Sequence, residues 1–126
     1  MRKLEDLKRH LLETVKPLKA DPAKLEIFVD KGDVRVCAGS LSFEYGYTAS
    51  LWIQDLTGST DQVAVPLLAW IAVNQPDLFE RGERKPFTFE AELLDADTYD
   101  LTITVALTEL VRVEARPNGL KVEHLP

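Results

Sequence analysis

The sequence predicts an α+β fold in which a mainly antiparallel sheet of about six strands, two of them long, packs against two amphipathic helices. Two stretches, residues 41–53 and 99–113, alternate apolar and polar side chains well beyond the usual strand length of about 5 or 6 residues. Two others, residues 3–16 and 63–71, place apolar side chains three or four residues apart, which is typical of helices. The expected order is helix, three strands, helix, three strands, in a single domain spanning residues 1–126.

The N-terminal segment predicts one helix followed by a hairpin. Pro17 and the stretch "KADPAK" should end the helix near Lys16 or a few residues later. In "LEIFVDKGDVRVCAG" the alternation restarts after Lys31-Gly32, so we expect a hairpin turn there. The apolar stripe of the helix is Leu4, Leu7, Leu11, Leu12, Val15 and Leu18, and the two hairpin strands carry Leu25, Ile27 and Val29, then Val34, Val36 and Ala38.

The run "SLSFEYGYTASLWIQDLTG" predicts the first long strand. Residues 41–53 would span about 40 Å if straight, whereas a globule of this size has a diameter of roughly 36 Å. Either Gly46 bends the strand inside a compact domain, or its end protrudes. Trp52 interrupts the polar face, and it either packs under a helix or loop or anchors an interface.

The second helix is expected after the S-x-x-Q pattern of Ser59 and Gln62, which has the spacing of a capping box. Pro66 either bends this helix or marks where its regular part begins. Pro76 should end it. Its apolar face is Val63, Leu67, Trp70 and Ile71, and we expect Trp70 in the core.

The remaining chain predicts sheet. Residues 87–93 alternate, "DAD" at 95–97 supplies a turn, and residues 99–113 form the second long strand. "RPNG" at 116–119 fits a type I turn before a short last strand. We expect the strands at 41–55 and 99–115 to pair or to be neighbours.

Composition argues against several function classes. The net charge is −6, and residues 41–100 carry eleven Asp/Glu against three Lys/Arg, whereas nucleic-acid binders concentrate basic residues on one surface. The sequence shows no phosphate-binding glycine motif and no apolar run approaching 18 residues. The single cysteine, Cys37, cannot form an internal disulfide, which fits a reducing compartment. We therefore expect no specific nucleic-acid binding and no membrane association.

The sequence shows no local catalytic or metal-binding pattern. His10 and His124 have no nearby Asp/Ser or Cys/His arrangement. "DADTYD" at 95–100 superficially resembles a calcium loop, but it lacks the glycine at position six and the glutamate at position twelve. Glu90 and Glu92 share a strand face, so a small hydrolase using them as acid and base is a weaker hypothesis. We expect no cofactor and no metal.

Three segments in this order resemble the phage tail completion protein R (GpR) family of contractile-tailed temperate phages and their prophages. They are "SLSFEYGYT", "VPLLAWIAVNQPDLF" and "FTFEAELLDADTYDLTITVALTE", behind "LKADPAKLEIFVDKG", and together they cover roughly residues 4–115. The resemblance implies a non-enzymatic structural protein of the virion tail, assembled in the host cytoplasm at the head-proximal end. By analogy with tail terminators, it further implies an α/β subunit of a six-fold ring that contacts the tail tube and head–tail joining proteins.

This reading leads to two hypotheses about residues. The overhanging strand ends should contact other subunits, since unpaired backbone groups can extend a neighbour's sheet; the candidate contact residues are Trp52, Tyr45, Tyr47, Asp95, Asp97 and Tyr99. The acids should face a lumen and repel DNA phosphates; the candidates are Glu90, Glu92, Asp95, Asp97 and Asp100. The alternative function is a small cytoplasmic adaptor whose long strand edge binds a partner.

Overall fold

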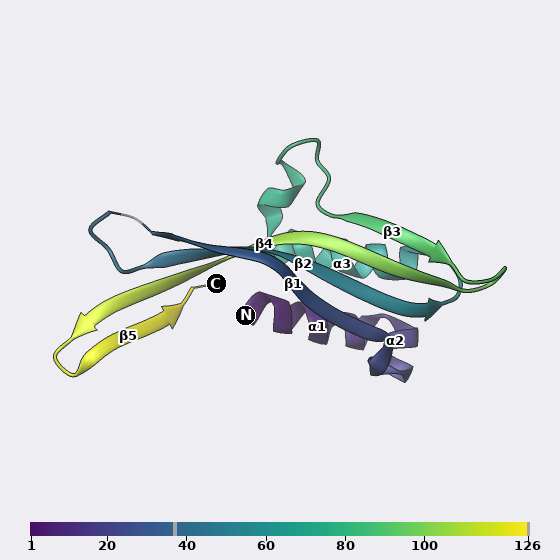
Figure 1. Ribbon diagram of the computed structural model, residues 1–126, viewed down its shortest axis with the longest axis horizontal. Coiled ribbons are helices and arrows are strands. Elements are labelled where there is room, and N and C mark those ends of the chain that lie inside the picture. Colours follow the sequence, from purple (N-terminus) through teal and green to yellow (C-terminus); the bar gives the residue numbers. More distant parts are fainter. Residues whose placement is uncertain (37, 126) are drawn as a thin grey trace.

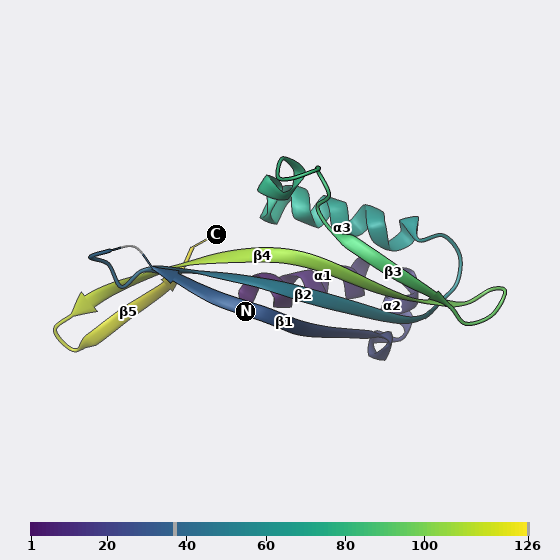
Figure 2. The ribbon, with the colours of Figure 1, turned by 45° about the horizontal axis from the view of Figure 1, so that its top comes forward.

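A computed structural model describes residues 1–36 and 38–125, and shows one strongly twisted antiparallel sheet with helices on one of its faces (Figures 1 and 2). The strands lie in the order β1-β2-β4-β3, and β5 pairs with the far end of β4 on the same side as β3. The helices are α1 (Arg2–Thr14), α2 (Lys16–Ala20) and α3 (Asp61–Asn74), and the short 3₁₀ turns are Pro22–Lys24 and Pro76–Phe79. The strands are β1 (Leu25–Val36), β2 (Phe43–Leu56), β3 (Thr88–Leu93), β4 (Tyr99–Arg116) and β5 (Gly119–His124).

The two long strands, β2 and β4, form the centre of the sheet. Their register runs from Phe43 opposite Val111 to Leu56 opposite Tyr99, which confirms that the two alternating runs are neighbours. Because side chains alternate between faces, the odd-numbered residues of β4 share one face, and from Tyr99 to Val111 they are buried on the side of the sheet that carries the helices. We call this the helix-side face and the opposite one the solvent face.

The expected hairpin at Lys31-Gly32 is wrong, because β1 is a single strand that pairs with β2 along its length. Val29 lies opposite Ala49 and Lys31 opposite Thr48, so Asp30 is an extra residue in a β-bulge. An inserted residue shifts the alternation from odd to even positions while keeping the apolar side chains on one face. A hairpin turn would produce the same change from odd to even apolar positions. The sequence alone therefore does not distinguish a turn from a bulge while the pairing of β1 with β2 is unknown. The described part of the sheet therefore has five strands instead of about six.

The first predicted helix is interrupted at Val15. That residue is extended, with φ −96° and ψ 110°, and α2 begins directly after it with Pro17 in its first turn. Proline is tolerated at that position because the first N–H groups of a helix have no intrahelical partner. Pro17 thus starts a second helix, which brings Leu18 into the core with Leu7 and Leu11.

The second predicted helix is confirmed as α3, but not its capping box. Ser59 Oγ accepts a bond from the Asp61 N–H, and the Gln62 side chain donates to the Thr57 carbonyl, so the two residues stabilise the preceding loop instead. Pro66 lies inside the helix. Its carbonyl is 2.9 Å from Nε2 of His10, which ties α3 to α1.

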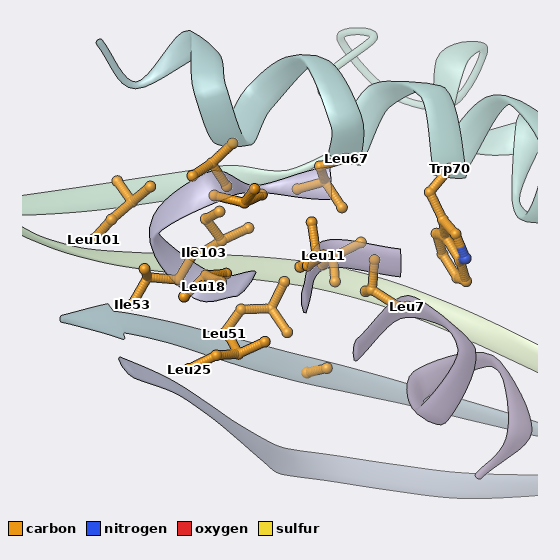
Figure 3. Packing of buried hydrophobic residues seen from close by; sticks show 14 of the residues in the cluster. Leu7, Leu11, Leu18, Leu25, Leu51, Ile53, Leu67, Trp70, Leu101 and Ile103 are labelled. Atoms are coloured by element: carbon orange, nitrogen blue, oxygen red, sulfur yellow. The ribbon is translucent and has the colours of Figure 1, made fainter. Parts of the chain in front are cut away.

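The core lies between the helix-side face of the sheet and the helices α1, α2 and α3 (Figure 3). Trp70 is buried as expected, and its indole N–H donates to Asp6 on α1 at 2.8 Å. Completely or almost completely buried are Leu7, Leu11, Leu18, Leu51, Ile53, Leu67, Ile71, Leu101 and Ile103.

A buried glutamine fills a gap along one edge of β4. β3 pairs with residues 99–104 of β4 and β5 with residues 111–116, which leaves an interval between them. In that interval the Gln75 side chain accepts a bond from the Thr108 N–H at 3.1 Å and donates to Thr108 Oγ1 at 2.9 Å. Gln75 is only 3% exposed, and it acts as a one-residue substitute for a strand.

We predict that Gln75→Ala leaves the Thr108 N–H unpaired in a buried position. The free energy of unfolding should fall by about 1–3 kcal/mol, the typical cost of an unsatisfied buried group. Hydrogen exchange read at Thr108 should accelerate relative to Ile103, which keeps its strand partners. Gln54→Ala, on the solvent face of β2, is the control. An unchanged Thr108 exchange rate would contradict the assigned role.

Candidate assembly interface

The helices cover only one half of the sheet. Toward the other end, the sheet divides into two hairpin arms that extend past the N-terminus of α1 (Figures 1 and 2). The first arm joins the end of β1 to the start of β2, residues 31–36 and 38–46. The second comprises the end of β4 and all of β5, residues 111–124. In both arms the described backbone continues the core sheet without the helix layer above it.

The arms carry apolar side chains on the helix-side face. Val36, Phe43 and Val111 lie side by side in one row of the register, and Val113 lies opposite Val122. Val36 is 69% exposed and Val122 is 58% exposed, although both point to the face that is buried elsewhere. Exposed large apolar residues of this face in the arms are Val34, Val36, Leu120 and Val122.

A buried carboxylate marks the boundary between the covered and uncovered halves. Glu109 is 5% exposed on the helix-side face, and it accepts bonds from the Tyr47 hydroxyl and from the backbone N–H of Arg2 at 2.9 Å. The first N–H groups of a helix have no intrahelical partner and lie at the positive end of the helix dipole, so a carboxylate stabilises them. Glu109 therefore fixes where the helix layer begins on the sheet.

Burial changes the acid–base properties of this boundary. Desolvation, followed by the hydrogen bond to Glu109, raises the pKa of Tyr47 far above its ordinary value. Desolvation lowers the pKa of Lys3, an effect that the nearby carboxylates of Glu109 and Asp77 partly offset. Lys3 Nζ donates to Gln75 at 2.7 Å, which joins the boundary to the gap on β4.

Comparison with known proteins identifies the family. The model of the P2 phage tail completion protein R (GpR) family matches residues 1–126. The chain belongs to this family. It is 39% identical over 128 residues to the tail completion protein R of Escherichia phage P2, an alignment that covers 99% of this chain and 83% of that protein. No solved structure matches the chain.

The tyrosines expected at a GpR interface lie on the helix-side face. Tyr47 and Tyr99 are 4% and 8% exposed, and they contribute to the core of the subunit. The Tyr99 hydroxyl donates to the Gly58 carbonyl at 3.1 Å. Tyr45 is half-buried and packs edge-on against Phe43 at the base of the first arm, with ring centroids 4.8 Å apart. Of these three side chains, Tyr45 lies nearest to the uncovered apolar face.

Trp52 lies on the solvent face of the sheet, half-buried. Its row contains Glu26 on β1, Thr102 on β4 and Glu90 on β3. The ring thus stands among side chains of the open sheet surface instead of lying beneath a helix. This position leaves one side of the indole available to another protein.

The acids expected to face a lumen share this solvent face. Glu90 lies opposite Thr102, and Glu92 lies opposite Asp100 at the adjacent pair of the same face. The Asp100 carboxylate also accepts a bond from the Asp55 N–H at 2.9 Å, where β2 is irregular. Glu26 adds a further carboxylate to the row of Trp52. One end of the solvent face is therefore acidic.

The remaining candidates, Asp95 and Asp97, lie in the exposed β3–β4 turn. Asp95 accepts bonds from the N–H groups of Asp97 and Thr98 at 2.8 and 2.9 Å, and these bonds lower its pKa. Its carboxylate organises the turn itself. Asp97 is exposed at the tip.

Sequence reasoning expected overhanging strand ends but did not place them as two arms beyond the helix layer, and it missed the burial of Glu109 and Gln75. Glu109 interrupts an otherwise apolar set of odd positions in β4, and this interruption is the signal that could have found it. Among the residues that the model describes, no cluster of His, Cys, Asp or Glu suits a metal ion. No described helix is long and apolar enough to cross a membrane.

We predict that Tyr47 makes the stability of the subunit sensitive to alkaline pH. Since its folded-state pKa is raised above the unfolded value of about 10, the folded state holds the proton more tightly. The contribution of Tyr47 to the free energy of unfolding should be constant below about pH 9 and should fall as the pH rises above about 10. Urea unfolding across this range measures the slope.

Tyr47→Phe should flatten the alkaline slope and lower stability at pH 7 by about 1–2 kcal/mol, because Glu109 loses a donor. Glu109→Gln is the informative companion variant. Burial is the leading cause of the raised pKa, so this variant should retain much of the alkaline fall. An identical slope in the parent and in Tyr47→Phe would contradict the prediction.

Proposed function

We propose that this chain completes the tail of a contractile-tailed phage or prophage, as a structural subunit that forms a ring on the head-proximal end of the tail tube. The observation that carries the proposal is the family match over residues 1–126, together with a relative whose name is tail completion protein R. Its partners are further copies of itself, the tail tube protein and the head–tail joining proteins.

The shape of the subunit supports this role. A ring that stops a growing tube needs a contact with its own neighbours and a second contact with the last layer of the tube. The arms provide an uncovered apolar face for the first contact. The half-buried Trp52, on the channel side of the sheet, is the candidate for the second contact, where the ring meets the tube. Large exposed apolar patches on soluble proteins commonly mark interaction sites.

The distribution of acids supports a lumen on the solvent face. Glu90, Glu92 and Asp100 lie together on this face, with Glu26 nearby. A negative surface repels DNA phosphates, so DNA can pass without binding. In this arrangement, the sheet lines the channel of the ring and the helices face outward.

An adaptor role for the same chain rests on the free outer edge of β1. Such an edge can pair with a partner's strand. The family match favours tail completion, and the cellular phenotype separates the two roles.

Removing the gene from the phage or prophage that encodes it tests the function. We expect tails that lack a finished head-proximal end and infectious particles reduced by at least about 100-fold, with baseplates intact. Electron microscopy of lysates and plaque counts measure both. Supplying the parent gene should restore finished tails and infectious particles. A variant that folds but lacks the contact residues should restore neither finished tails nor infectious particles. Normal tails without the gene would overturn the proposal and leave the adaptor.

We predict that Trp52→Ala abolishes tail completion without unfolding the subunit. Trp is enriched among the interface hot spots, whose truncation costs about 2 kcal/mol or more of binding. Complementation in the deletion strain measures function, and far-UV circular dichroism with thermal melting measures folding. Gln54→Ala, the next position on the same face of β2, is the matched control and should complement fully. Full complementation by Trp52→Ala would remove Trp52 from the interface.

We predict that the double variant Glu90→Lys/Glu92→Lys assembles tails but delivers DNA poorly. The new charges should bind phosphates, and raising the ionic strength should partly relieve the defect because salt screens such attraction. Potassium efflux and DNA release during infection measure delivery. Glu5→Lys/Glu13→Lys makes the same charge change on exposed positions of α1 and should deliver normally. Unchanged delivery in both variants would mean that these acids do not face the channel.

A further inference from the structure

Helix α3 is apolar on two sides. One stripe, which includes Val63, Leu67 and Trp70, faces the core. A second stripe faces away from the sheet: Val65 is 63% exposed and Val73 is 80% exposed. The complete outward stripe is Val65, Leu68, Ala69, Ala72 and Val73. These spacings of three and four residues make one continuous ridge, and the sole charge in the helix is Asp61 at its start. A helix that is apolar all round is normally buried on both sides.

The arms present an apolar face that no helix of the same subunit covers. The β4–β5 arm is a two-stranded ribbon beyond Val111, and such a ribbon is marginally stable by itself. Its helix-side face, with Leu120 and Val122, continues the face that α1 and α3 cover in the rest of the sheet. A helix with an apolar, uncharged surface is therefore the element that this face accommodates elsewhere in the same subunit.

The charges around the two surfaces are complementary. Residues 55–80, which include α3, carry four Asp/Glu and no Lys/Arg. Residues 111–123 of the second arm carry three Lys/Arg against two Asp/Glu. Opposite charge steers two surfaces together and disfavours contact between two copies of the same surface. Within the arm, Arg112 pairs with Glu123 and Arg116 with Glu114, which leaves an excess of one basic residue. This excess favours an arm on the acidic segment around α3 over an arm on a second arm.

The twist of the sheet makes this contact repeat head to tail. At the right end of Figure 1, β3 lies above β4, and β1 lies lowest. At the left end, the β1–β2 arm lies above the β4–β5 arm, and Figure 2 shows the same reversal. The helix-side face of the arms is thus turned away from the direction that α3 faces. The two surfaces do not meet within one subunit, and a repeated contact between them is heterologous.

We propose that the apolar face of the arms of one copy packs against the outward stripe of α3 of the next copy, and that this contact joins the subunits of the ring. The arms then wrap the helix layer of the neighbour from outside, while the acidic solvent face stays toward the channel. The inference rests on the proposed ring, but the contact is measurable with purified protein and no tail.

Cysteine cross-linking tests the contact. In a Cys37→Ser background, one chain carries both Val73→Cys on α3 and Val122→Cys on β5. A short bismaleimide added to concentrated protein should produce a ladder of dimers, trimers and longer species in denaturing gels, because each copy presents both ends of the contact. An isologous dimer would stop at two subunits, so a ladder that ends at dimers would overturn the head-to-tail arrangement.

Matched variants control for random collision. Val73→Cys alone and Val122→Cys alone should yield few cross-links, and a mixture of the two should yield dimers only. The pair Leu93→Cys and Val122→Cys uses an exposed apolar residue of β3 outside both surfaces, 80% exposed like Val73, and should form no ladder. A ladder as strong with Leu93→Cys, or none with Val73→Cys, would overturn the proposal.

Charge variants link the contact to assembly. Val73→Glu and Val122→Glu should each reduce self-association at least about 10-fold in sedimentation experiments, with unchanged circular dichroism. If these variants still self-associate like the parent, the contact is elsewhere. If self-association is lost but tails are completed normally, the contact stands and the proposed tail function fails. The two proposals can therefore fail separately.

Discussion

The sheet of this protein is longer than the helices that cover it. Eighteen residues of β4 extend about 60 Å, whereas the thirteen residues of α1 and the fourteen of α3 extend only about 20 Å each. A helix would need roughly twice as many residues as a strand to span the same distance. Since the helix-side face stays mainly apolar beyond Glu109, where the helix layer ends, the shortfall in helix leaves an apolar surface uncovered. The arms, their exposure and their proposed use all depend on this mismatch of lengths.

The boundary of the covered region is held by polar contacts. Glu109 receives the N-terminus of α1 and the hydroxyl of Tyr47, and Gln75 occupies the gap between β3 and β5. Buried polar groups of this kind fix position because each has few alternative partners. If α1 moved along the sheet by one turn, Glu109 would lose the Arg2 N–H as a donor. The contacts therefore define where the subunit's own core ends and where the surface for a neighbour begins.

Membership of the GpR family agrees with the presence of uncovered surfaces on the subunit, because a tail completion protein acts through contacts with other proteins. A protein that acts by assembling needs no reaction centre, and its informative features are the surfaces that its own chain leaves unpartnered. Here these are the outward ridge of α3, the arms and the acidic end of the solvent face. In the proposed ring, the ridge of α3 and the arms contact neighbouring copies, and the solvent face, with Trp52 and its acids, faces the tube and the channel.

The sequence by itself determined the fold class, the two long strands and the core face of α3, because the period of apolar residues reports which side of an element is buried. It also contained the bulge at Asp30, but as a phase shift that a hairpin explains equally well when the strand opposite is unknown. The tertiary structure decided the register of β1 on β2, the role of Pro17 at the start of α2, and the pairing of Glu109 with Arg2 and Tyr47. It alone separated buried from uncovered residues on the helix-side face: Leu107 and Val122 have the same place in the alternation, and only the reach of α1 and α3 distinguishes them. Local periodicity indicates which face is apolar, whereas coverage depends on elements far apart in the chain.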